Sequence, residues 1–183
     1  MSKSGPASRL IRRGAVLRFV LWLAGLMIAF NAVFYLWLAE SRFIQVYLSW
    51  NARASALLLR VFGESATAVG TNVGSPRFSL EVKDGCDALQ PMAFFIFAML
   101  ASPVPVRLRS RLLPILVGMS ALLLLNLVRI LTLFYTGIYF PKAFEPLHID
   151  VWQSLFIFLP LTFWLVWALR AMRSSGTTTH ADT

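Results

Sequence analysis

The chain is poor in charged side chains and above all in acids. Of its 183 residues only 14% are charged, of which eight are Asp or Glu, whereas 58% are hydrophobic. A soluble domain is roughly a quarter charged. So much apolar surface cannot all be buried in one water-facing core of this size, which excludes an ordinary soluble enzyme and a disordered regulator. The composition therefore predicts an integral membrane protein.

Cysteine and histidine are also scarce. The single cysteine, Cys86, excludes an intramolecular disulfide and a multi-cysteine metal cluster, and a redox role would lack a resolving cysteine. Two histidines, His148 and His180, leave few ligands for a metal ion. The sequence also lacks the glycine-rich nucleotide-binding motifs, the HExxH motif and any repeat of 20–50 residues. We therefore predict no cofactor and no metal.

Four apolar runs predict an all-α membrane protein of one domain with about four transmembrane helices. A spanning helix needs about 20 apolar residues, and the second run is short because Pro103 and Pro105 end it. Trp152 and Trp167 lie near the ends of the last run, where interface anchors are expected. The predicted spans are residues 17–38, 87–106, 112–136 and 149–171.

The distribution of charge predicts the orientation. Ten basic residues in segment 1–18, the loop 107–111 and the segment after 169 share one side with a single acid, Asp182. The positive-inside rule places both termini and this loop in the cytoplasm, with residues 1–16 as a basic tail and 174–183 as a disordered tail. The net charge of +9 is thereby explained by topology, and no nucleic-acid partner is predicted. The first span lacks a small-x-small cleavage site after it, so we expect an uncleaved anchor.

The outer segment, residues 40–86, is predicted to begin with an amphipathic helix over residues 42–62, lying in the interface or capping the bundle. Its expected polar positions are Arg42, Gln45, Ser49, Arg53, Ala56 and Arg60, opposite Ile44, Tyr47, Leu48, Leu58, Leu59 and Phe62.

A small β-hairpin is expected next. Phe78, Leu80 and Val82 alternate with polar residues, which is typical of a half-buried strand. The turn residues 74–76 make residues 67–73 the expected partner strand.

Cys86 directly precedes the second span. Asp87 and Gln90 have the spacing of a capping box, which predicts that the helix begins just after the cysteine. A helix N-terminus lowers the pKa of a thiol, whereas the nearby carboxylates of Asp84 and Asp87 raise it. The alternative interpretation is a small core residue.

Arg129 lies inside the third span. A charge at that depth costs on the order of 3 kcal/mol and needs a polar environment. Asn126, Thr132 and Thr136 share its helical face. Arg129 could instead extend to the headgroups or pair with an outer carboxylate such as Glu145 or Asp150.

His148 lies at the outer entrance of the fourth span. The dipole of a helix N-terminus opposes protonation, which favours a neutral imidazole able to accept a proton. Asp150 could orient this ring or simply complement the helix dipole, and an isolated interfacial histidine can be inert. His180 follows a Ser/Thr-rich stretch, and no role is predicted for it.

The topology brings Cys86, Arg129 and His148 from three different spans to the outer end of the bundle. A thiol, a base and a fixed cation are the groups that thiol-based acyl transfer requires. The short second span would let the membrane thin beside the cysteine, which suits a substrate cut where it leaves the bilayer.

At these residues the sequence resembles the exosortase/archaeosortase family of membrane cysteine transpeptidases, and its small size resembles the short exosortase H type. The matching pieces are Gly85-Cys86 after a strand, Asn126-Leu127-Val128-Arg129-Ile130 in an apolar helix and His148 before the last span. They cover residues 78–171, a little over half of the chain. Asp87 departs from the small or uncharged residue that many relatives have after the cysteine.

The resemblance implies a bacterial inner-membrane enzyme whose active site faces outward. Its substrates would be exported proteins that end in a sorting signal, made of a short motif, a transmembrane helix and a basic tail. Cys86 would form a thioester and pass it to an acceptor amine or water, His148 would act as general base and acid, and Arg129 would hold the oxyanion. Asn126 is a candidate for orienting Arg129.

Two other functions remain open from the sequence. One is a non-catalytic membrane assembly or scaffold subunit in which Arg129 forms a structural ion pair. The other is an S-acyl or lipid transferase that uses Cys86 as the carrier.

Overall fold

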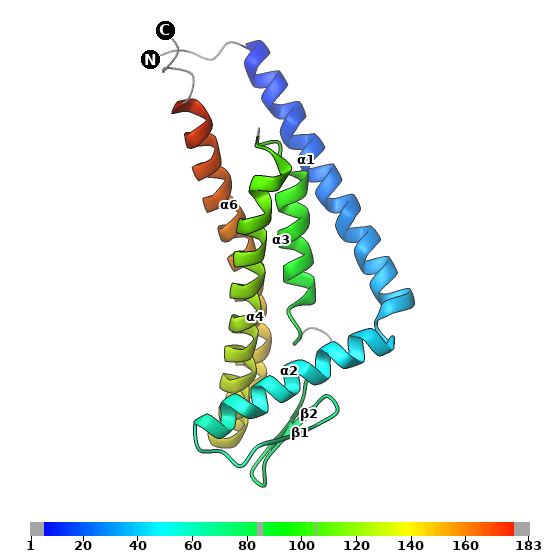
Figure 1. Cartoon of the computed structure of the whole chain (residues 1–183), viewed down its shortest axis with the longest axis vertical. Helices are drawn as coiled ribbons and strands as arrows, with labels where there is room; N and C mark the ends of the chain where they lie inside the picture. Colours follow the sequence, from blue (N-terminus) through cyan, green and yellow to red (C-terminus); the bar gives the residue numbers. More distant parts are fainter. Residues whose placement is uncertain (1–5, 84–85, 105, 178–183) are drawn as a thin grey trace.

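The protein is mostly helical with one small sheet, as predicted. The computed structural model describes residues 6–83, 86–104 and 106–177. Its helical elements are α1 (Pro6–Val33), the π-helical η1 (Phe34–Leu38), α2 (Arg42–Val61), α3 (Leu89–Ala101), α4 (Leu108–Tyr139), the 3-10 turn η2 (Pro141–Ala143), α5 (Phe144–Pro146), the π-helical η3 (Leu147–Gln153) and α6 (Ser154–Thr177). The strands are β1 (Thr67–Val69), β2 (Asn72–Gly74) and β3 (Ser79–Glu81) (Figure 1).

Three helical segments of the described chain are long and apolar enough to cross a membrane: Gly14–Leu38, Leu108–Tyr139 and Pro141–Arg173. The expected second span is the 13-residue α3, which rises only about 20 Å, against about 30 Å of hydrocarbon. It ends early because Ser102, just before Pro103, already has extended backbone. The predicted count of four spans is therefore not confirmed.

Both terminal helices extend beyond the predicted spans. α1 begins at Pro6, inside the expected basic tail, and α6 continues to Thr177, into the expected disordered tail. Once a helix is nucleated, each further residue adds a hydrogen bond at little cost, so a polar flank continues it. Residues 1–5 and 178–183, with His180, lie outside the described residues.

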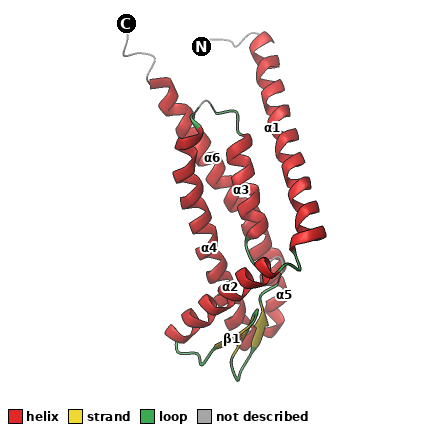
Figure 2. Ribbon diagram, turned by 45° about the vertical axis from the view of Figure 1, so that its right-hand side comes forward, coloured by secondary structure: helices red, strands yellow, loops and turns green. Residues whose placement is uncertain are grey.

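The helices form a bundle with a lateral layer at one end. In both views α3 lies between α1 and the pair α4 and α6 (Figures 1 and 2). The start of α1, the end of α6 and the α3–α4 loop lie at one end, here the terminal end; α2, the sheet and η3 lie at the other, here the sheet end. One apolar core joins α2, the sheet and α4, and a second joins α3, α4 and α6.

The expected amphipathic helix is α2, which crosses the sheet end. The Oγ of Ser41 accepts a hydrogen bond from the backbone N–H of Ile44, at 3.4 Å, and so caps its first turn. The expected polar position Ala56 is only 2% exposed, because α2 packs on both α4 and the sheet and so buries a wider face. Phe62, expected on the buried face, is 66% exposed because the helix has ended at Val61.

The sheet has three strands, so the simple hairpin prediction was wrong. The turn between β2 and β3 lies as expected, with Val73 opposite Leu80. The segment 67–73, however, is not one strand: Gly70 adopts φ +59° and turns the chain, so that β1 pairs back on β2. Glycine occupies such left-handed backbone without steric cost.

A buried arginine ties α3 to α4 at the terminal end. Arg111 is 8% exposed and its guanidinium donates to the backbone carbonyls of Met99, Leu100, Ser102 and, at 2.8 Å, Val104. These include carbonyls that the end of α3 leaves without helical partners. Trp167, expected as an interface anchor, lies under the same guanidinium at 5.5 Å from the ring centre.

Arg111→Met is expected to destabilise the protein by about 2–3 kcal/mol, because it leaves buried carbonyls without their charged donor. Thermal unfolding in detergent measures the effect. Arg109→Met is the matched control, since it removes a charge from the same turn at an exposed position. Equal unfolding temperatures for the two variants would contradict the capping role of Arg111.

Candidate functional site

Cys86 lies in a tight turn before α3. Its backbone N–H donates to the carbonyl of Lys83 at 2.9 Å, and Ala88 takes a left-handed conformation at φ +62°. Such backbone is unusual for a residue other than glycine and often occurs at functional sites. The residues between Lys83 and Cys86 lie outside the described part of the chain; they are Asp84, the expected nearby carboxylate, and Gly85 of the Gly85-Cys86 motif.

The predicted capping box does not form. Asp87 Oδ1 does accept a hydrogen bond from the backbone N–H of Leu89, at 3.0 Å. The Gln90 side chain, however, donates to the hydroxyl of Tyr35 at 2.7 Å and does not complete the box. The left-handed turn at Ala88 changes the approach of the chain to α3, which begins only at Leu89.

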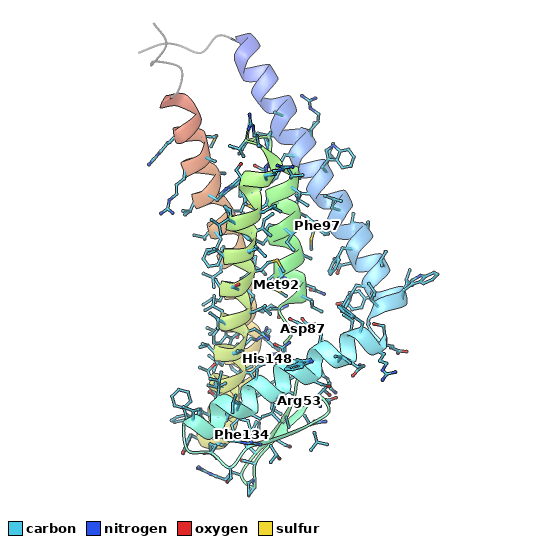
Figure 3. The ribbon with its side chains drawn as sticks, in the orientation of Figure 1. Arg53, Asp87, Met92, Phe97, Phe134 and His148 are labelled. Carbon is cyan, nitrogen blue, oxygen red and sulfur yellow. The ribbon has the colours of Figure 1, made fainter. Side chains whose placement is uncertain are left out.

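The thiol of Cys86 and the imidazole of His148 are in contact. The Sγ atom lies 3.1 Å from Nε2 of His148, although the two residues are 62 positions apart. Figure 3 shows His148 and Asp87 toward the sheet end of the bundle. A thiol at hydrogen-bond distance from an imidazole can transfer its proton to the ring.

The element that carries His148 is fixed to α4 by a tryptophan. Trp152, one helical turn after His148 in η3, donates from Nε1 to Oγ1 of Thr132 at 3.1 Å. Trp152 is 8% exposed, so the prediction that it anchors the membrane interface was wrong. The π-helical winding of η3 is a feature that often accompanies functional sites.

Arg129 lies inside the bundle and does not extend to the surface. Only 4% of Arg129 is exposed, and its guanidinium carbon lies 5.4 Å from the ring centre of Phe156. It borders a cavity of about 480 Å³. The cavity lining comprises Met27, Asp87, Gln90, Pro91, Phe94, Arg129, His148, Gln153, Phe156 and Ile157.

Opposing influences set the acidity of the thiol. Burial raises the pKa of Cys86 above its ordinary value, the positive charge of Arg129 lowers that pKa, and the carboxylate of Asp87 raises it. Burial is the largest influence, so the pKa of the thiol lies above its ordinary value, which disfavours the thiolate. A nucleophilic thiolate therefore requires a base, and His148 is the group in contact.

The positions of Asn126 and Asp150 differ from those expected of residues that orient Arg129 and the imidazole of His148. Asn126 is fully buried, and its Nδ2 donates to Oδ1 of Asn51 in α2 at 3.4 Å, so it joins α4 to α2. Asp150 is exposed, two positions after His148. Two positions along a helix correspond to nearly opposite faces, which turns Asp150 away from the imidazole.

Sequence reasoning missed the role of Tyr47. Its hydroxyl donates to the backbone carbonyl of Asp87 at 2.5 Å, which ties α2 to the turn that carries Cys86. Burial, the largest influence, together with the charge of Asp87 raises the pKa of Tyr47 to about 12, against a lowering by the side chain of Asn51. A tyrosine on the expected apolar face, whose hydroxyl must find a partner when buried, was the only sequence signal.

A family model described as transmembrane exosortase (Exosortase_EpsH) matches residues 7–165. The chain belongs to the transmembrane exosortase family. No curated protein and no solved structure matches it. Family membership and the three long apolar helices make this exosortase a multi-pass membrane protein.

The influence of Arg129 on the thiol can be measured by alkylating Cys86, the only cysteine of this exosortase, across a range of pH. The midpoint is expected above the ordinary thiol value. Arg129→Gln removes the group that lowers the pKa and moves the midpoint up, whereas Asp87→Asn moves it down. Arg53→Gln, an exposed change in α2, is the control. A wild-type midpoint below the ordinary value, or shifts of opposite sign, would contradict this assignment.

Proposed function

We propose that this exosortase is a membrane cysteine transpeptidase or protease that cleaves the C-terminal sorting signals of exported proteins. A sorting-related transpeptidase role is general to the family. The observation that carries the proposal is the 3.1 Å contact between the Cys86 sulfur and Nε2 of His148, next to a cavity bordered by Arg129.

The first half of the proposed reaction forms a thioester. His148 Nε2 takes the proton of the thiol while the sulfur bonds to the carbonyl carbon of the substrate. The negative charge that develops on the carbonyl oxygen is stabilised by the buried guanidinium of Arg129. The carbon–nitrogen bond then breaks, and the departing amine, which bears the helix and basic tail, takes the proton from His148.

The second half releases the acyl group. An acceptor amine or a water molecule gives its proton to His148 and bonds to the thioester carbon. The carbon–sulfur bond breaks, and the sulfur regains the proton as the thiol of Cys86. The cycle needs no oxidant, metal or cofactor, because both halves move only protons and an acyl group.

The proposed orientation places the sheet end on the outer side of a bacterial inner membrane. The exposed basic residues Arg107, Arg109, Arg170 and Arg173 belong to the terminal end of the bundle, which the positive-inside rule assigns to the cytoplasm. A substrate with a basic tail obeys the same rule. Its scissile bond, outside its own helix, would then lie at the level of Cys86.

The alternative is a non-catalytic scaffold subunit in which Arg129 is a structural cation. Its support is that Arg129 and the acid Asp87 are both buried and border the same cavity. In that case Cys86 is a small core residue. The two functions therefore differ in what a change at Cys86 does.

Cys86→Ala and Cys86→Ser are expected to abolish processing of a co-expressed sorting substrate, and Arg129→Ala to lower it by about 100-fold or more, as for loss of an oxyanion donor. Arg129→Lys should keep little activity, because an ammonium does not reproduce the planar guanidinium. Gel mobility of the substrate measures processing, and membrane insertion of each variant is checked in parallel.

Arg53→Ala serves as the control, since Arg53 is an exposed arginine of α2. Processing that continues in Cys86→Ala would refute the proposed chemistry. A destabilised Arg129→Ala together with a silent Cys86→Ala would favour the scaffold.

A further inference from the structure

The cavity next to the Cys86–His148 pair extends away from these residues between three helices. Met27 belongs to α1, Phe94 to α3 and Ile157 to α6, and all three line it. Its volume of about 480 Å³ is in the range of sites that bind small molecules or short peptide segments. The cavity therefore lies between α1, α3 and α6.

The lining changes in polarity along the cavity. Asp87, Arg129 and His148 form its charged or titratable part, whereas Met27 and Ile157 are apolar. Ile157 is 61% exposed, so the apolar part reaches the outer surface of the bundle. Ile157 belongs to a segment long and apolar enough to cross a membrane, in which such an exposed surface would face lipid.

One ring contact closes the space between α1 and α6 toward the terminal end, and another holds α1 against α3. Toward the terminal end, Phe19 of α1 stacks on Trp164 of α6, with ring centres 5.1 Å apart. Phe30, on the other side of Met27, meets Phe97 of α3 edge-on at 5.9 Å. At the level of Met27, therefore, α1 is held against α3, and the space toward α6 is the cavity.

The flank of α6 beside the opening is suited to an apolar helix. Ile157, Leu161 and Leu165 follow one another at intervals of four residues, and each is at least 41% exposed. Residues at this spacing form one stripe along a helix. A second apolar helix lying along this stripe would have its end beside the cavity.

Two amides in the lining suit an unwound peptide. A peptide that leaves its helix at membrane depth has N–H and C=O groups that need partners. Gln153 lines the cavity with both a donor and an acceptor. Gln90, which also lines the cavity, gives its Nε2 hydrogen bond to the Tyr35 hydroxyl, so its Oε1 can serve as an acceptor.

We infer that the opening between α1 and α6 is a lateral entrance, through which an apolar segment of a polypeptide substrate passes from the bilayer to Cys86. The inference rests on the proposed function, because it assigns a path to that substrate. The helix of the substrate lies along the α6 stripe. The extended residues before it occupy the cavity, where Gln90 and Gln153 bind their peptide groups.

Filling the entrance tests this path. The probe is a co-expressed exported reporter that ends in a short motif, an apolar helix and an arginine cluster from a protein of the same organism. Met27→Trp is expected to lower its processing at least tenfold, and Gln153→Leu by about tenfold. Ile28→Trp, at a 70% exposed position next to Met27, should change processing less than twofold.

Alkylation of Cys86 by iodoacetamide, a small water-soluble reagent that needs no path through the bilayer, should stay within twofold of wild type in Met27→Trp. Equal losses of alkylation and processing would contradict a separate entrance, as would full processing by Met27→Trp.

Crosslinking provides a second readout that does not need turnover. Benzoylphenylalanine at position 27 or 28 of a Cys86→Ala chain is irradiated in the presence of the reporter. We expect at least tenfold more reporter crosslinked from position 27. Equal crosslinking from both positions would overturn the entrance.

The results that would refute the proposed function differ from those that would refute the entrance. They are the absence of processing by the wild-type protein and continued processing by Cys86→Ala. In either case the crosslinking still decides the entrance separately.

Discussion

The contact between a buried thiol and an imidazole constrains much of this molecule. Cys86 and His148 belong to segments that the sequence separates by 62 positions, and each must be held within hydrogen-bond distance of the other. The turn of Cys86 is held by Tyr47, which binds the backbone of Asp87, and by the Asp87 side chain at the start of α3. The turn of His148 is held by Trp152 on Thr132. Side chains from α2 and α4 thus fix the geometry of a pair that belongs to neither helix.

Among the residues whose burial the structure describes, two arginines are buried, toward opposite ends of the bundle, and their surroundings differ. Arg111 is surrounded by backbone carbonyls at the end of α3, so its hydrogen bonds are used within the fold. Arg129 borders an open cavity beside the thiol, and its charge acts on Cys86. A cation that borders a cavity can act on a group bound there, so Arg129 is a candidate for chemistry, whereas Arg111 is a structural residue.

Much of the architecture could be predicted because membrane insertion leaves few choices. Long apolar runs must be helices, and their order brings Cys86, Arg129 and His148 to one end of the bundle. The local details depended on contacts between distant segments. Ala88 in left-handed backbone, the extra turn at Gly70 and the hydrogen bond from Tyr47 to Asp87 have no periodic signal. The exposure of Asp150 and the burial of Trp152 could not be predicted, because sequence proximity does not tell which face of η3 meets α4.

The central claim is that the Cys86 sulfur becomes covalently acylated by the substrate. Because Cys86 is the only cysteine, intact-mass spectrometry of the purified protein after incubation with a sorting substrate tests this directly. The account predicts an added mass equal to the acyl part of the substrate, lost on treatment with hydroxylamine, which cleaves thioesters. Substrate cleavage at the wild-type rate while Cys86 gains no acyl mass, or cleavage that continues after Cys86 has been alkylated, would contradict it.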